Sequence, residues 1–142
     1  MTEPFRVRIE VRGYELDTQG HLNGAVYWQY GDHARWACLS AAGVDVDALI
    51  ADGIGPVTLE TTVRFHRELR RGDAVDVTCA FVWGAGKTFE VRQEIRRADG
   101  TLAAELTSVG GLLDLESRRL LPDPGARWSA RAAAPELLGL VA

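Results

Sequence analysis

Residues 25–42, AVYWQYGDHARWACLSAA, carry the longest helical pattern in the chain. Val26, Tyr30 and Ala34 recur at every fourth position, which places them on one face of an α-helix. Small and aromatic residues also occupy the other sides of this helix. We therefore expect a sheet to wrap around it, because a helix lying on a surface keeps one broad polar face. Gly43 follows directly and is a natural stop for the helix.

Alternation of apolar and polar residues, the pattern of half-buried β-strands, dominates the rest of the chain. It begins before the helix, in residues 5–12. Four further alternating stretches follow the helix, at residues 57–65, 74–83, 88–95 and 101–115. Asp99-Gly100 predicts a tight hairpin, and Gly110-Gly111 indicates a bulge or close backbone packing. The predicted order is one strand, a long helix and four consecutive antiparallel strands, which is an α+β fold.

Length and composition place these elements in one domain. A chain of 142 residues with 46% apolar and 25% charged residues is ordinary for a globular protein, which excludes a disordered, collagen-like or disulfide-stapled chain. We expect a single domain over residues 1–142, with its core at about 5–122. The tail at 123–142 is expected to be irregular, with a short helix near 135–141. An open sheet leaves edges to protect, so a dimer that continues the sheet is a natural arrangement.

Charge and cysteine content disfavour several partners. Sixteen Lys and Arg residues against twenty Asp and Glu residues give a net charge of −4, which disfavours nucleic-acid binding. No run approaches the ~20 apolar residues of a membrane span, and the first twelve residues lack the apolar core of a signal peptide. Cys38 and Cys79 lie in apolar patterns, as expected of reduced thiols in the cytoplasm. Without Cys-x-x-Cys or His-Glu-x-x-His spacing, we expect no metal and no other cofactor.

The densest group of polar and glycine residues lies between the first strand and the helix, at residues 14–24, YELDTQGHLNG. It brings the carboxylate of Asp17 toward a helix start, where unpaired backbone N–H groups can polarise a carbonyl oxygen. A carboxylate that faces a polarised acyl carbon can hydrolyse it, as nucleophile or as base for water. The alternative interpretation is structural: Asp17 or Asn23 caps the helix and Gly20 makes a turn.

A family resemblance adds to this motif. Residues 11–27, VRGYELDTQGHLNGAVY, and residues 30–35, YGDHAR, resemble the hotdog-fold acyl thioesterases, in particular the 4-hydroxybenzoyl-CoA-thioesterase-like group. Further matches lie at residues 63–73, VRFHRELRRGD, and 114–122, DLESRRLLP. The resemblance covers residues 5 to about 122. It implies a long central helix wrapped by a curved antiparallel sheet of five or six strands, with active sites at the interface of a homodimer or homotetramer.

The resemblance also implies roles for individual residues. Asp17 matches the family's catalytic carboxylate, and the backbone N–H near Gly24 matches the group that polarises the thioester carbonyl. His21 and Asn23 match positions that shape the loop. Gly24 departs from the family pattern, because a second Asn usually stands there. A backbone donor survives this change, whereas any side-chain contact from that position is lost.

Two sets of helix residues have competing interpretations. The aromatic residues of the helix are Tyr27, Trp28, Tyr30 and Trp36. They could line an acyl or aryl pocket, and Tyr27 is the one expected to bind substrate, but we expect most of them in the core. Asp32 is a second candidate for the catalytic carboxylate, because some relatives use a carboxylate on the helix. The favoured interpretation of Asp32 is structural: a solvated helix residue or one paired with Arg35.

A group of arginines follows the second predicted strand. Arg64, Arg67 and Arg70, with the adjacent Arg71, could meet the phosphates of CoA or an acidic carrier protein. A solvated strand end explains them equally well.

These observations predict a hydrolase that cleaves an acyl-CoA or acyl-carrier-protein thioester to free acid and thiol. Two alternatives stay open. One is a hydratase or dehydratase of the same fold acting on acyl thioesters, in which Asp17 and His21 would form the catalytic pair. The other is a protein that binds acyl thioesters without turnover.

Overall fold

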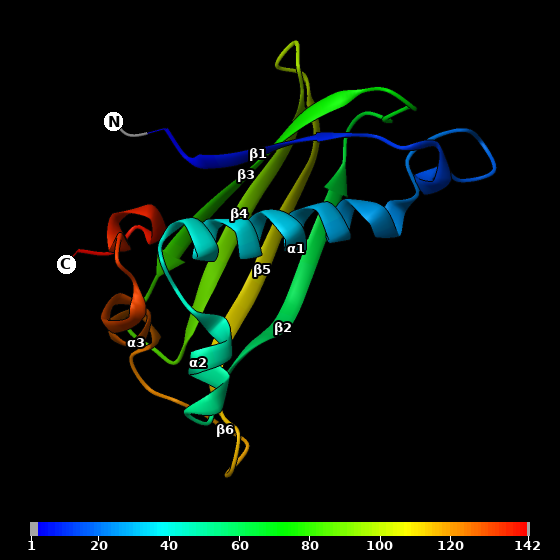
Figure 1. The fold of residues 1–142 in the computed structure, drawn as a ribbon. Coiled ribbons are helices and arrows are strands. Elements are labelled where there is room, and N and C mark those ends of the chain that lie inside the picture. The colour runs from blue at the N-terminus through cyan, green and yellow to red at the C-terminus, as the bar shows by residue number, and fades with distance from the viewer. Residues whose placement is uncertain (1–2, 142) are drawn as a thin grey trace.

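One long helix lies across a curled antiparallel sheet of six strands (Figure 1). The structure is a computed structural model and describes residues 3–141. Its elements in chain order are β1 (Phe5–Glu10), the 3-10 helix η1 (Gly13–Glu15), α1 (Gly24–Ala41), α2 (Val46–Ala51), β2 (Ile54–Phe65), β3 (Ala74–Trp83), β4 (Thr88–Arg97), β5 (Leu102–Asp114), β6 (Arg119–Leu120), α3 (Pro124–Arg131) and the 3-10 helix η2 (Pro135–Leu138). The expected curved sheet around a long helix is therefore confirmed.

The strand order in the sheet is β1-β3-β4-β5-β2, with β6 paired to β5. Strands β3, β4 and β5 follow one another as an antiparallel meander. β2 pairs with β5 rather than with β3, so the chain crosses the sheet between β2 and β3. Because of this crossing, β1 and β2 are the two edge strands of the sheet. The strand order could not be predicted from the sequence, because alternation within a strand does not show which strand it pairs with.

Element boundaries largely follow the sequence pattern. The predicted helix at 25–42 is α1, shifted by one residue, and the predicted strand at 74–83 is β3. Gly43 ends the helix with φ +83°, a left-handed conformation that favours glycine. β2 begins at Ile54, before the alternation becomes visible.

Two short helices lie where the sequence predicts none. α2 spans only six residues, and its start is fixed by the Asp45 side chain, which accepts the Ala48 N–H at 3.1 Å. α3 lies in the tail expected to be irregular. Its single large apolar residue, Trp128, gives no periodic pattern from which a helix could be inferred.

Two hydrophobic clusters fill the space between α1 and the sheet. The first surrounds the N-terminal half of α1 and includes Tyr27 and Tyr30, and the second surrounds the C-terminal half and includes Cys38. The tail belongs to the second cluster, because Trp128 and Leu138 are fully buried in it. Residues beyond the expected core at 5–122 therefore complete the interior.

The four aromatic residues of α1 divide between core and surface. Tyr27 and Tyr30 are each 3% exposed, as expected. Trp28 and Trp36 are 39% and 38% exposed, so the expectation of a core position is wrong for them. The physical reason is that α1 packs mainly on β3 and β1, which leaves its opposite side uncovered.

The double glycine of β5 packs closely, as predicted. A Cβ on Gly110 would lie 3.1 Å from the Val57 carbonyl oxygen, and one on Gly111 would lie 2.8 Å from Leu120 Cδ2. The bulge itself is on the partner strand, where the register of β2 shifts between Thr58 and Glu60.

Helix α1 approaches the sheet closely at Gly31. The Gln93 side chain of β4 donates a buried hydrogen bond of 2.7 Å from Nε2 to the Gly31 carbonyl. A Cβ on Gly31 would lie 2.9 Å from both Gln93 Oε1 and Leu106 Cδ2. Only a residue without a side chain lets the helix reach this depth.

We expect Gly31→Ala to lower the free energy of unfolding by about 1–3 kcal/mol, because the added methyl group overpacks the helix–sheet contact. Urea denaturation followed by circular dichroism measures the change. Gly86→Ala is the matched control, since a Cβ there meets nothing within 4 Å, and it should stay within roughly 0.5 kcal/mol of the wild type. Equal unfolding midpoints for the two variants would contradict the packing described for Gly31.

Candidate active site

The polar segment between β1 and α1 is a compact turn held by backbone hydrogen bonds. The Asp17 N–H donates to the His21 carbonyl at 2.7 Å, which closes the turn. The Leu22 N–H donates to the Leu69 carbonyl, also at 2.7 Å, and ties the turn to the segment after β2. Gly20 reverses the chain with φ +77°, so the turn predicted at this glycine is present.

The Asp17 carboxylate is fixed through one of its two oxygens. Oδ1 accepts the backbone N–H groups of Gln19 at 2.8 Å and His21 at 3.1 Å. These donors, the His21 amide foremost, lower the pKa of Asp17 because they stabilise its charged form. Among residues 3–141, Oδ2 has no hydrogen-bond partner, so it can bond to a substrate or a water molecule.

Helix α1 begins at an amide that the rest of the described chain leaves unpaired. Asn23 is the cap: its side-chain oxygen accepts the Ala25 N–H at 3.0 Å, and its carbonyl accepts the Val26 N–H at 2.9 Å. The Gly24 N–H has no acceptor within residues 3–141. It stands at the positive end of an 18-residue helix, where negative charge is stabilised. Asn23 thus caps the helix and Asp17 does not.

Glu15 braces the turn, although no local sequence pattern distinguishes it from its polar neighbours. Its carboxylate accepts the Tyr30 hydroxyl at 2.6 Å and the Arg12 N–H at 2.9 Å. Its carbonyl accepts the Asn23 N–H at 2.9 Å. Burial and the nearby carboxylate raise the pKa of Tyr30. Glu15 therefore links the end of β1, the start of α1 and the second turn of α1.

Asp17 and Gly24 line one groove at the N-terminal end of α1. The groove is open to solvent and has a volume of about 480 Å³. Its other lining residues are His21, Leu22, Tyr27, Phe65, His66, Arg67 and Glu68. The Phe65 ring lies beside Gly24, 3.7 Å from where a Cβ on that glycine would stand. It also packs edge-on against Tyr27, with 5.0 Å between ring centroids, so the groove has an aromatic wall next to the free amide.

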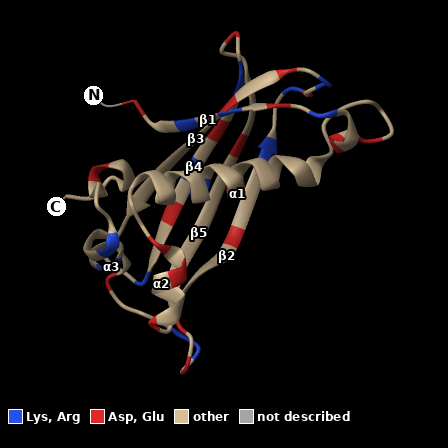
Figure 2. Cartoon of the chain, in the orientation of Figure 1, with Lys and Arg blue, Asp and Glu red and all other residues tan. Residues whose placement is uncertain are grey.

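The structure separates the three arginines predicted to bind substrate. Arg67 lines the groove that contains Asp17. Arg64 lines a different depression together with Glu105, and Arg70 is exposed and donates to the Glu68 carboxylate at 3.2 Å. Basic and acidic residues are interspersed over the strands and loops in the view of Figure 2. Only Arg67 of the three stands beside the groove.

The remaining candidates take distinct positions. The His21 imidazole lies 4.0 Å from the Glu68 carboxylate, whereas its backbone, not its ring, contacts Asp17. Asp32 is ion-paired with Arg35, as the favoured interpretation predicts, and does not line the groove.

Some features are absent from the part of the chain that the structure describes. Within residues 3–141, no three His, Cys, Asp or Glu side chains gather in a way that could hold a metal ion. None of the described helices is long and apolar enough to cross a membrane. Cys38 and Cys79 are free and buried.

Residues 11–137 match the family model of the thioesterase-like superfamily. The match includes the Asp17 turn, all of α1 and the four long strands β2 to β5 that follow it, but not β1. The chain belongs to this superfamily.

Two named thioesterases are similar in sequence. The chain is 38% identical over 73 residues to the chloroplastic acyl-acyl carrier protein thioesterase ATL3 of Arabidopsis thaliana, a region that covers 51% of this chain and 38% of that protein. It is 26% identical over 118 residues to the long-chain acyl-CoA thioesterase FadM of Escherichia coli, covering 82% of this chain and 89% of that protein. The alignment with the plant relative thus spans well under half of its length.

Solved structures show the same fold. The probable thioesterase YbaW from Escherichia coli superimposes with a TM-score of 0.76 at 26% identity, over 83% of this chain and 89% of that one. Slr0204, a 1,4-dihydroxy-2-naphthoyl-CoA thioesterase from Synechocystis, gives a TM-score of 0.82 at 19% identity, over 90% and 95% of the two chains. The second likeness is one of fold alone. The hotdog fold expected from the sequence is confirmed.

We expect the carboxyl group of Asp17 to titrate below the ordinary aspartate value of about 3.9, because two backbone N–H groups stabilise its ionised form. Carbon-detected NMR of the side-chain carboxyl groups measures the pKa, and Asp17→Asn assigns the signal by removing it. Asp17 should remain charged at every pH above the ordinary range. A pKa at or above the ordinary value would contradict the hydrogen bonds to Oδ1.

Proposed function

We propose that the protein hydrolyses the thioester bond of an acyl-CoA or of an acyl group on a carrier protein, releasing the free acid and the thiol. The proposal rests on one observation: the same groove contains the free Asp17 Oδ2 and the Gly24 N–H, which has no acceptor within residues 3–141. Membership of the thioesterase-like superfamily and the names of the relatives support it.

The two groups divide the chemistry between them. The Gly24 N–H binds the thioester carbonyl oxygen and stabilises the negative charge that gathers there during attack. The Asp17 carboxylate either takes a proton from a water molecule that attacks the carbonyl carbon, or attacks that carbon itself to form an anhydride that water then opens. On both routes the C–S bond breaks and the sulfur leaves as thiolate, which takes up a proton to give the thiol. Asp17 is charged at neutral pH, as an ordinary aspartate is, and its lowered pKa extends the charged form to more acidic pH.

The surroundings of Asp17 favour hydrolysis over hydration of an enoyl thioester. The hydratase alternative requires the Asp17 carboxylate to pair with the His21 imidazole. The His21 ring instead stands 4.0 Å from Glu68, and Asp17 is bonded to the His21 backbone. The aromatic wall of Tyr27 and Phe65 offers apolar surface to the acyl group beside the reacting carbonyl.

The proposal extends to a homo-oligomer that forms through β2. This edge strand is 12 residues long and exposes Leu59 by 54% and Phe65 by 58%. A long edge strand with apolar side chains is a template for pairing with another strand. A second copy placed there would also border the groove, because Phe65 belongs to both. A cytoplasmic location is supported by the two free, buried thiols.

Replacing Asp17 by Asn should reduce kcat by at least about 100-fold, because the amide can neither accept the proton nor attack the carbonyl. Release of free thiol from short to long aliphatic acyl-CoAs, benzoyl-CoA and phenylacetyl-CoA measures the rate. The matched control is Asp99→Asn in the exposed β4–β5 hairpin, which should hydrolyse at the wild-type rate.

The outcomes separate the alternatives. An Asp17→Asn protein that turns over like the wild type would remove Asp17 from the mechanism. Activity confined to acyl-carrier-protein substrates would identify the thiol carrier. Tight binding of acyl thioesters without hydrolysis of either kind would contradict the enzyme and favour a binding protein.

We expect Leu59→Lys to shift the oligomer toward monomer, because a charge on an edge strand opposes strand pairing. Sedimentation velocity at several protein concentrations measures the equilibrium. Leu137→Lys, on the tail and also exposed, is the control and should sediment as the wild type does. A wild-type protein that is monomeric at every concentration would contradict pairing through β2.

A further inference from the structure

The Asp17 turn, residues 15–23, forms a short antiparallel ladder between β1 and α1. At its base the Asn23 N–H donates to the Glu15 carbonyl at 2.9 Å, and the next pair of residues forms an antiparallel bridge. Asp17 lies two residues beyond Glu15 on one arm of this ladder, and Gly24 directly follows Asn23 at the end of the other arm. The separation between the Asp17 carboxylate and the Gly24 N–H therefore depends on how the turn is seated against α1.

Within residues 3–141, two hydrogen bonds join this turn to parts of the chain more than ten residues away. In the first, the N–H of Leu22, which is 3% exposed, donates to the Leu69 carbonyl at 2.7 Å. In the second, Oε1 of Glu15 accepts the Tyr30 hydroxyl of α1 at 2.6 Å. Without the second bond the turn keeps a single distant anchor, about which it can pivot. The Glu15 side chain thus fixes the orientation of the turn on the helix.

The Glu15 carboxylate lies largely out of water, where a charge-assisted hydrogen bond is strong. Its side chain is 9% exposed, and Tyr30 is 3% exposed. The same oxygen, Oε1, also accepts the Arg12 N–H at 2.9 Å. Neither Glu15 nor Tyr30 is among the residues that line the Asp17 groove. The two side chains are therefore placed to hold the turn and not to touch a substrate.

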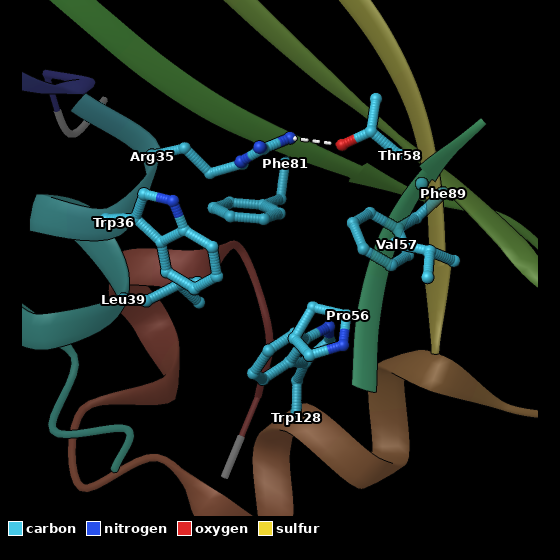
Figure 3. Close-up of a pocket in the computed structure, with 10 residues that line it drawn as sticks. Arg35, Trp36, Leu39, Pro56, Val57, Thr58, Phe81, Phe89 and Trp128 are labelled. Carbon is cyan, nitrogen blue, oxygen red and sulfur yellow. Dashed lines mark hydrogen bonds between the residues drawn. The ribbon is translucent and has the colours of Figure 1, made fainter. Parts of the chain in front are cut away.

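The part of α1 that receives the turn is itself held firmly on the sheet. Tyr30 directly precedes Gly31, whose carbonyl accepts the buried Gln93 side chain at 2.7 Å. Further along the helix, Arg35 Nη1 donates to Thr58 Oγ1 of β2 at 2.9 Å, the dashed line in Figure 3. The last turns of α1 lie among aromatic side chains of β3, β4 and α3 (Figure 3). Glu15 therefore ties the turn to a fixed point of the fold.

We propose that Glu15 is a positioning residue: its side chain holds the Asp17 carboxylate at a fixed place relative to the Gly24 N–H. The proposal rests on the hydrolysis proposed for Asp17 and Gly24, and it adds the residue that sets their geometry. Displacing a catalytic group by about 1 Å can cost about 100-fold in rate, so the brace controls turnover without contacting the reacting atoms.

Two variants test the proposal through the rate of hydrolysis. Glu15→Ala removes both side-chain hydrogen bonds and should lower kcat by about 10- to 100-fold. Tyr30→Phe removes one of them and should lower kcat by roughly three- to ten-fold. KM should stay within about two-fold of the wild type in both, because neither side chain lines the groove. Thiol release from the acyl-CoA that the wild type hydrolyses fastest measures both constants.

Asp45→Ala is the matched control for a loss of stability. It removes a carboxylate that fixes the start of another helix, α2, by accepting the Ala48 N–H at 3.1 Å. This variant should unfold more easily, as after the loss of a helix cap, while kcat and KM stay at their wild-type values. If Glu15→Ala behaves in the same way, with lower stability but the wild-type kcat, Glu15 is a stability residue only and the proposal is overturned.

Glu15→Gln separates geometry from charge. Both side-chain hydrogen bonds are accepted by Oε1, so a carboxamide oxygen at the same place can accept both without a negative charge. Glu15→Gln should therefore recover kcat to within about three-fold of the wild type. A Glu15→Gln protein as slow as Glu15→Ala would show that the charge of Glu15 matters rather than the position it imposes, and would contradict the proposal.

Crystal structures of the wild type and of Glu15→Ala test the position directly and need no turnover. In the variant, the Asp17 carboxylate should move by about 1 Å or more relative to the Gly24 nitrogen, or spread over several positions. Tyr30→Phe provides the same comparison if Glu15→Ala does not fold, since it removes only a hydroxyl group. A carboxylate as well ordered as in the wild type, and at the same distance from Gly24, would overturn the proposal.

The two kinds of measurement separate this proposal from the proposed activity. If the wild type hydrolyses no thioester but Asp17 moves in Glu15→Ala, the positioning of Asp17 by Glu15 stands and the hydrolysis fails. If hydrolysis depends on Asp17 while Glu15→Ala and Tyr30→Phe keep the wild-type kcat, the activity stands and the positioning role of Glu15 fails.

Discussion

The buried hydrogen bond from Gln93 to the Gly31 carbonyl sets the depth at which α1 lies against the sheet. With no side chain at Gly31, the middle of the helix sits directly on β4 and β5. The packing of α1 on β3 and β1 then fixes the direction of the helix, and so the position of its two ends. Its start places the Gly24 amide in the Asp17 groove, and its C-terminal half lines a mostly apolar pocket together with β2 and Trp128 of α3.

The turn before α1 combines two electrostatic requirements in a few residues. Its own N–H groups hold Asp17 in the charged form through one oxygen, which leaves the second oxygen for chemistry. The next residues cap the helix at Asn23 without covering the amide of Gly24. The side chain of Glu15 fastens this arrangement to Tyr30, so the carboxylate and the amide are carried on one braced unit.

The sequence predicts what depends on local periodicity. Alternation predicts the long strands, the spacing of apolar residues predicts the helix, and the polar and glycine residues at 14–24 predict the Asp17 turn. The pairing of β2 with β5 does not, because strand order depends on contacts between residues far apart in the chain. α3 and the burial of Trp128 were equally beyond local patterns, since a single tryptophan in a polar segment looks like a surface residue. The brace at Glu15 is visible only once Tyr30 is brought beside it.

The tail ties the last described residues to the middle of the chain. The Ala134 N–H donates to the Ala42 carbonyl at 2.9 Å, and Trp83 Nε1 donates to the Leu138 carbonyl at 2.7 Å. The second hydrophobic cluster is therefore incomplete until Leu138 is available. During synthesis on the ribosome, α1 and the strands emerge before residues 124–138, so part of the apolar surface of the second cluster stays uncovered until this segment follows.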